Sequence, residues 1–200
     1  YATKGYLEKL IAQVFTGRER FEPGNPQEGY SPSPQERQSW LQISYMKEAY
    51  HTMGPKFTLG WMAEALYSSK NFSENYTATM MQAGEFAPTP HSKLMYNEAF
   101  RANQYVAAGI KPIYVLNDMF QFRTEFYGFT PIFPIKKNAL NKAYYGKAFS
   151  RFEYMGEVSV ICHLPFGAIS AYVNHYSSPR REWNVGMTIG WQLFNYRFVE

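Results

Sequence analysis

The sequence W-N-V-G-M-T-I-G-W-Q-L-F, residues 183–194, alternates between large apolar side chains and small or polar ones. Such period-two alternation is typical of a β-strand with two different faces. Twelve residues at about 3.3 Å each, tilted by about 40°, rise roughly 30 Å, which is the thickness of the hydrocarbon core of a bilayer. Soluble strands usually contain only about five or six residues. The stretch therefore predicts a transmembrane β-strand whose apolar face contacts lipid.

The composition fits strands better than membrane-spanning helices. The chain has 200 residues, of which 46% are hydrophobic and 18% aromatic. Apolar and polar residues are interleaved, and no segment approaches the run of about 18 apolar residues that a membrane helix needs. Aromatic side chains are abundant at both interfaces of membrane barrels, so their excess favours that class, although a large soluble β-core would also use them.

Alternating segments recur along the chain and predict about eight strands. They lie at residues 5–15, 39–50, 57–68, 104–116, 119–128, 147–163, 168–175 and 183–194. The connection at residues 69–103 is the longest and contains a short helical segment at residues 75–82. Longer connections alternate with short turns, so an up-and-down meander places all the long ones at one end, as outer-membrane barrels do. A Greek-key sandwich has no reason to sort its connections in this way.

We therefore predict an all-β fold: an antiparallel up-and-down meander that forms part of a transmembrane β-barrel. Eight strands could close alone, but only into a narrow barrel. Charged residues of the strands fall on the polar faces, where they would line a wet interior rather than face lipid. Glu125, Glu153 and Glu157 are examples.

Most chemical functions find no support in the sequence. There is no G-x-S-x-G nucleophile motif and no glycine-rich phosphate loop, and Asp118 is the only aspartate. The four histidines lack metal-ligand spacing, and the single cysteine, Cys162, excludes an internal disulfide. The net charge of +4 is scattered, with no Lys/Arg cluster for nucleic-acid binding. We assign no catalytic residue, no cofactor, no metal and no nucleic-acid partner to these residues.

Several longer motifs resemble a known family. They are N-Y-T-A-T-M-M-Q-A-G-E-F-A-P-T-P-H-S-K at residues 75–93, F-R-A-N-Q-Y-V-A-A-G-I-K-P-I-Y at residues 100–114 and F-G-A-I-S-A-Y-V-N-H-Y-S-S-P at residues 166–179. Together they resemble the C-terminal barrel of patatin-like phospholipases of Gram-negative bacteria, over essentially the whole chain. The segment F-R-A-N-Q-Y also resembles the arginine motif at the tip of the inward-folding loop in BamA-like surface-antigen barrels.

The resemblance implies an outer-membrane protein of which residues 1–200 form the second half of a 16-stranded barrel, with residues 69–103 as the inward loop. A patatin domain upstream would hydrolyse lipid esters, and residues 1–200 would anchor it without being catalytic. Implied partners are membrane lipids, that upstream domain and the barrel-assembly machinery, and a homodimer stays open. The pattern of Asn184, Gly186, Ile189 and Trp191 resembles the C-terminal signal that this machinery reads.

By the same resemblance, Arg101 is a structural loop residue that reaches into the lumen. Its candidate partners are the inner-face carboxylates of Glu125, Glu153 and Glu157. A glycine often follows the arginine in the family, whereas Ala102 follows it here. A solvated loop arginine is the competing interpretation.

Two alternatives remain at this stage. The first is a BamA-like barrel for protein assembly or translocation, without enzyme activity. The second is a soluble β-sandwich that serves as a binding module. A G-x-S-x-G motif upstream would select the hydrolase, and partition into buffer without detergent would select the sandwich.

Overall fold

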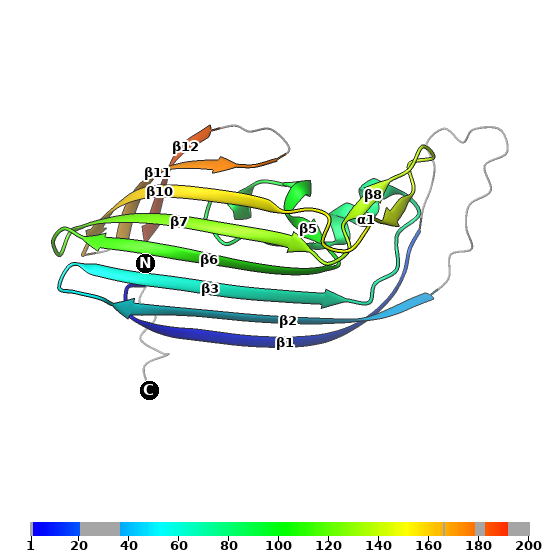
Figure 1. The fold of residues 1–200 in the computed structure, drawn as a ribbon, viewed down its shortest axis with the longest axis horizontal. Coiled ribbons are helices and arrows are strands. Elements are labelled where there is room, and N and C mark those ends of the chain that lie inside the picture. The colour runs from blue at the N-terminus through cyan, green and yellow to red at the C-terminus, as the bar shows by residue number, and fades with distance from the viewer. Residues whose placement is uncertain (1, 21–36, 166, 179–182, 192–200) are drawn as a thin grey trace.

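The computed structural model describes residues 2–20, 37–165, 167–178 and 183–191. Within these ranges the chain is mostly β-structure, and eight long strands form one antiparallel sheet (Figure 1). The strands pair in the order in which they follow along the chain: β1 (Gly5–Arg18), β2 (Arg37–Thr52), β3 (Phe57–Ser68), β6 (Gln104–Val115), β7 (Phe120–Pro131), β10 (Glu153–Leu164), β11 (Gly167–Tyr176) and β12 (Trp183–Trp191). The predicted all-β, eight-stranded antiparallel meander is confirmed.

The two ends of the sheet differ, as the connection lengths predict. Residues 53–56 and 116–119 make tight turns at one end, which we call the turn end. Residues 69–103 and 132–152 emerge at the opposite end, which we call the loop end (Figure 1). The eight strands of this sheet contain between 9 and 16 residues, so most are far longer than the five or six residues that are usual in soluble proteins.

The strand predictions fail mainly beside the connection at residues 132–152. Residues 147–152 were expected to be extended, but β10 begins only at Glu153. Phe149 has φ of 51°, in the left-handed region, and a strand cannot continue through that conformation. A small hairpin of β8 (Ile135–Lys137) and β9 (Ala143–Tyr145) precedes it. Residues 192–194 of the expected last strand lie outside the described residues.

Within the described residues the sheet is open. β1 and β12 lie at its two edges, and no backbone pairing joins them. Each edge therefore presents backbone N–H and C=O groups that a further strand could bind. None of the described helices is long and apolar enough to cross a membrane.

Residues 69–103 fold back onto one face of the sheet. The segment contains α1 (Tyr76–Gln82), the short strands β4 (Gly84–Glu85) and β5 (Arg101–Ala102), and the 3-10 turns η1 (Ser92–Leu94) and η2 (Glu98–Phe100). The helix expected at residues 75–82 is confirmed. Asn75 caps it, because its side-chain oxygen accepts a hydrogen bond of 2.8 Å from the backbone N–H of Ala78.

Aromatic packing holds this segment, which we call the docked loop, against the sheet. The ring of Phe86 stacks on Phe129 of β7 at a centroid distance of 5.9 Å and meets the edge of Tyr127 at 6.0 Å. The ring of Phe100 packs on Phe129 at 5.7 Å and on Tyr176 of β11 at 6.0 Å. These contacts join the docked loop to the sheet in one buried apolar cluster.

Replacing Phe86 by alanine should remove the centre of this cluster. Phe86 is only 1% exposed, so Phe86→Ala should lower the free energy of unfolding by about 3–5 kcal/mol. Denaturant unfolding in detergent measures the change. Leu94→Ala, at an exposed position of the same loop, is the control and should change stability by less than about 0.5 kcal/mol. Equal effects of the two changes would contradict the docking described above.

Candidate functional site

The sheet has one charged, buried face and one apolar, exposed face. On β7, Phe122 is 44% exposed and its neighbour Arg123 only 5%. On β10, Val160 is 38% exposed, whereas Glu157 is 6% exposed. We call the face that carries Arg123 and Glu157 the inner face and the opposite one the outer face. The sequence alternation predicts this separation, and the structure has it on both strands.

The outer face carries aromatic side chains at both ends of the strands. Exposed aromatic residues of the turn end are Tyr6, Phe57, Tyr114 and Phe120, and those of the loop end are Tyr67, Phe152, Tyr154 and Trp183. On β3 the two groups are represented by Phe57 and Tyr67. Ten residue steps at about 3.3 Å separate the two rings by roughly 33 Å along the strand. In a barrel whose strands tilt by about 40°, this distance corresponds to roughly 25 Å along the barrel axis.

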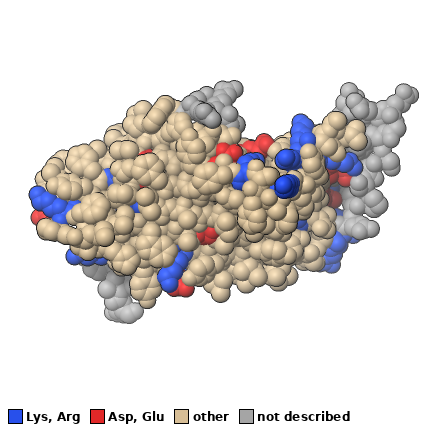
Figure 2. All heavy atoms as spheres, in the orientation of Figure 1, with Lys and Arg blue, Asp and Glu red and all other residues tan. Residues whose placement is uncertain are grey.

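Charged side chains are sparse between these two ends. Figure 2 shows one broad face over β2, β3, β6 and β7 that is largely uncharged, with Lys, Arg, Asp and Glu gathered toward the ends. An exposed ion pair of 3.2 Å between Lys47 and Glu8 joins β2 to the edge strand β1 on the outer face.

Arg101 is held within the docked loop itself. Its Nη2 donates to Glu85 Oε2 at 2.5 Å, and its Nη1 donates to the carbonyl oxygens of Met81 at 3.1 Å and Ala83 at 3.2 Å. The guanidinium also lies over the ring of Tyr96, 4.8 Å from its centroid. Glu85 and Arg101 face each other because they are register partners in the β4–β5 pair. The arginine therefore fixes the helix end and the hairpin of the docked loop to each other.

The three carboxylates suggested as partners of Arg101 have other neighbours. Glu125 accepts hydrogen bonds from Arg123 and Tyr127 on its own strand. Glu153 accepts a hydrogen bond of 2.5 Å from the hydroxyl of Ser177. None of them is the partner that the structure gives Arg101. Sequence analysis missed Glu85 because a two-residue strand pair leaves no alternation to detect.

Glu157 occupies a different environment from the other two carboxylates. It lies beside Glu125 on β7 and Asn174 on β11 in the strand register. Among the described residues, Glu157 Oε2 and both polar side-chain atoms of Asn174 are buried without a hydrogen-bond partner. The inner face thus has a buried polar position that the docked loop covers.

The remaining inner-face charges near the turn end are paired across the sheet. Lys111 Nζ lies 2.6 Å from Glu48 Oε1, which joins β6 to β2. Arg123 Nη2 donates to the hydroxyl of Tyr50 at 2.9 Å, which joins β7 to β2. Since β2 and β7 are not neighbours in the sheet, these side chains reach across the concave interior.

The docked loop meets polar side chains as well as aromatic ones on the loop-end half of the inner face. The hydroxyl of Tyr105 donates to Glu64 at 2.6 Å and to the backbone oxygen of Glu85 at 3.2 Å. His91 Nδ1 lies 2.8 Å from the hydroxyl of Tyr176, and burial lowers the pKa of its imidazole. The cross-sheet pairs of Lys111 and Arg123 therefore lie near the turn end of the inner face, and the contacts of the docked loop lie near the loop end.

Comparisons with known proteins do not assign this chain to a family. A scan against protein-family models, a search of curated proteins and a search of solved structures each found no match. In the described part of the chain, no group of three or more His, Cys, Asp or Glu side chains is placed to hold a metal ion.

Replacement of Arg101 by lysine should destabilise the docked loop. Arg101→Lys keeps the charge but loses the planar fork that reaches both Glu85 and the helix carbonyls. We expect the variant to lower stability by about 1–3 kcal/mol and to speed proteolysis within residues 69–103, with unchanged strand content by circular dichroism. Lys93→Ala, at an exposed position of the same loop, is the control.

A double-mutant cycle identifies the partner directly. Arg101 should be energetically coupled to Glu85, measured with Glu85→Gln, and not to Glu125, measured with Glu125→Gln. Coupling to Glu125 instead would contradict the pairing described here.

Proposed function

We propose that residues 1–200 form part of the wall of a bacterial outer-membrane β-barrel that anchors a patatin-like lipid acyl hydrolase. The observation that carries the membrane part is the outer face, which exposes large apolar side chains on strand after strand, while the charged residues of the central strands β6, β7 and β10 face inward. Exposed apolar area of this extent on a single face marks a surface that another apolar phase covers. Aromatic groups at both ends, about 25 Å apart, match the girdles and apolar band of outer-membrane barrels.

The two open edges support further strands in the same barrel. In hydrocarbon each unpaired backbone group costs several kcal/mol, so only closed barrels are viable there. The sheet must close on itself or be completed by other strands. The resemblance to patatin-associated barrels favours completion to 16 strands, with residues 1–200 as the second half and the docked loop inside the lumen.

The enzymatic part of the proposal rests on the motifs at residues 75–93 and 100–114. They resemble the barrels that follow a patatin domain, which carries a Ser–Asp dyad. The barrel itself would serve as the anchor, with membrane lipids around it and the barrel-assembly machinery as its partner during insertion. The fragment carries no residue to which we assign catalysis.

A BamA-like assembly or translocation barrel is the second candidate. It is favoured by the docked loop with its arginine, which such barrels share and which the structure places on the inner face. The inner face alone does not separate the two candidates, because both use a loop that folds inward.

Two neighbouring positions on β12 test the membrane part. Met187 is exposed on the outer face, whereas Thr188 is half-buried and faces inward. Met187→Arg should cost about 2–4 kcal/mol in lipid and reduce the heat-resistant, membrane-inserted fraction of the full-length protein, and Thr188→Arg should reduce it much less. Insertion is measured by extraction of membranes with urea. Equal insertion of the two variants, or a monomer that is soluble without detergent, would contradict a lipid-facing outer face.

The sequence that precedes residue 1 in the full-length protein tests the enzymatic part. We expect a G-x-S-x-G motif there, at a strand-to-helix turn, and an aspartate that completes the dyad. Replacement of that serine by alanine should abolish labelling by a fluorophosphonate probe in outer-membrane fractions. A preceding sequence without this motif would leave the BamA-like barrel as the better proposal.

A further inference from the structure

The connection at residues 132–152, which joins β7 to β10 at the loop end, is strongly basic. We call it the basic connection. The hairpin of β8 and β9 forms its middle part and projects from the loop end of the sheet (Figure 1). Figure 2 shows Lys and Arg atoms gathered toward this end of the molecule. The basic connection contains no acidic residue, and its cations are Lys136, Lys137, Lys142, Lys147 and Arg151.

Three of these cations have no carboxylate partner among the described residues. The other two are paired. Lys142 Nζ lies 3.6 Å from Glu74 Oε1. Arg151 Nε lies 3.5 Å from Glu153 Oε1. The three without an ion pair are exposed to solvent, and they are Lys136, Lys137 and Lys147. The basic connection therefore presents three positive charges that the described part of the chain does not balance.

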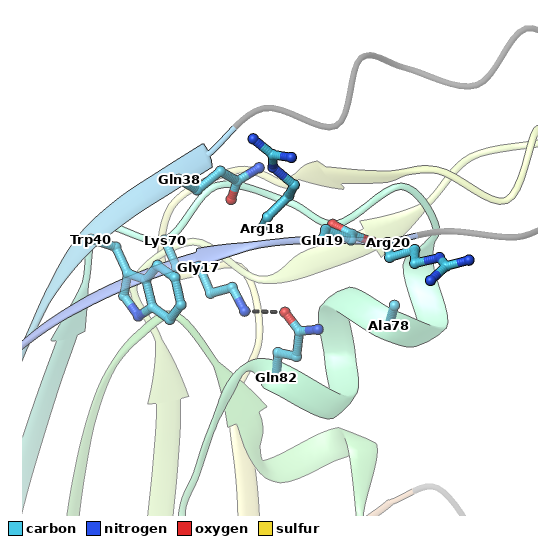
Figure 3. Close-up of a pocket in the computed structure, with 9 residues that line it drawn as sticks. All are labelled: Gly17, Arg18, Glu19, Arg20, Gln38, Trp40, Lys70, Ala78 and Gln82. Atoms are coloured by element: carbon cyan, nitrogen blue, oxygen red, sulfur yellow. Dashed lines mark hydrogen bonds between the residues drawn. The ribbon is translucent and has the colours of Figure 1, made fainter.

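Cations at a neighbouring cavity are arranged differently. Lys70 lies in a cavity between the ends of β1 and β2 and the helix α1, where its ammonium donates to Gln82 Oε1, as the dashed line in Figure 3 marks. Its Nζ also lies 4.7 Å from the ring centroid of Trp40. The side chains of Arg18 and Arg20 point away from Lys70 in the same view. This cavity therefore does not gather its cations into one group.

Two contacts place the basic connection directly beyond the outer face. Tyr145 lines a cavity of about 290 Å³ together with Tyr67, the outer-face aromatic residue near the end of β3. The ring of Phe152 lies over Gly128 of β7, where a Cβ would be 2.9 Å from it. Tyr67 and Phe152 both belong to the loop-end group of exposed aromatic residues on the outer face. Lys147 follows Tyr145 by two residues, so its charge lies close to this aromatic group.

Exposed aromatic side chains lie among the lysines. Tyr144 is 45% exposed and is the register partner of Lys136 in the β8–β9 pair. Phe149 is 62% exposed and follows Lys147 by two residues. Because side chains alternate along a strand, Lys136 lies on the side opposite Ile135, which packs against α1. Cations interleaved with exposed apolar groups are typical of segments that lie at the surface of an anionic membrane.

We propose that the basic connection binds the phosphate groups of anionic lipids in the leaflet that surrounds the loop end. The proposal rests on the lipid-facing outer face proposed above and adds a class of lipid to it. The headgroup region on each side of the hydrocarbon core is about 5–8 Å thick, so lysines just beyond the aromatic residues lie at the level of the phosphates. Their stems pack along apolar surface while the ammonium groups reach the phosphates. Such cations attract an anionic surface by their summed charge and do not have to converge on one ion.

The lipid composition beside the basic connection tests the proposal. The full-length protein, made cysteine-free and then given a fluorophore at the exposed position Ala148→Cys, is reconstituted in phosphatidylcholine vesicles. Spin-labelled phosphatidylglycerol or spin-labelled phosphatidylcholine serves as the quencher. We expect phosphatidylglycerol to be enriched beside the fluorophore at least about fivefold, which corresponds to about 1 kcal/mol, the contribution of one lysine at such a surface. Raising the salt from about 0.1 M to about 1 M should remove the enrichment.

Lysine variants assign the enrichment to particular side chains. Lys147→Gln should lower it, and the combination with Lys136→Gln and Lys137→Gln should bring the ratio of the two lipids close to one. Lys93→Gln, at an exposed lysine of the docked loop, is the matched control and should leave the ratio unchanged.

The state of the protein in the vesicles separates failure of this proposal from failure of the proposed function. Protein that resists extraction by urea but shows no enrichment, or an equal loss of enrichment in Lys93→Gln, would overturn the lipid-binding role of the basic connection and leave the lipid-facing outer face standing. Protein that does not insert into the vesicles would contradict the lipid-facing outer face, and this proposal with it.

Discussion

An extended backbone directs successive side chains to opposite faces, and this constraint organises the whole sheet. Because strand after strand alternates in the same sense, the apolar residues add up to one continuous outer face and the charged residues to one inner face. A one-residue slip in any pairing would turn charges such as Arg123 outward and aromatic rings such as Phe122 inward. The long registers oppose such a slip.

The same alternation explains how much of the fold was predictable. The eight long strands lie in segments that the alternation predicts, and the predicted bounds of β3, residues 57–68, match the structure. The failure at Phe149 has a local cause, since its left-handed backbone interrupts a segment that still alternates in sequence. The partner of Arg101 could not be predicted, because Glu85 is brought opposite it by a pair of two-residue strands.

The docked loop and the sheet each contain their own buried ion pair. Arg101 pairs with Glu85 inside the docked loop, whereas Lys111 pairs with Glu48 inside the sheet. Ion pairs that remain within one part lose little when the two parts separate. What joins loop to sheet is mainly the aromatic cluster around Phe86 and Phe129, with a few hydrogen bonds such as that of His91 with Tyr176.

The mainly apolar contact between docked loop and sheet determines what release of the loop would cost. Release of the docked loop would expose the apolar cluster, at a cost of roughly 25 cal/mol for each Å² returned to water, but would leave the ion pairs of Arg101 with Glu85 and of Lys111 with Glu48 intact. It would also open Glu157 Oε2 and the side chain of Asn174, which are buried without a hydrogen-bond partner among the described residues, to hydration. Burying an unpaired carboxylate and amide costs free energy, so their hydration offsets part of the apolar cost. The inner face is therefore built so that docking rests on apolar contacts and is opposed by these two polar groups.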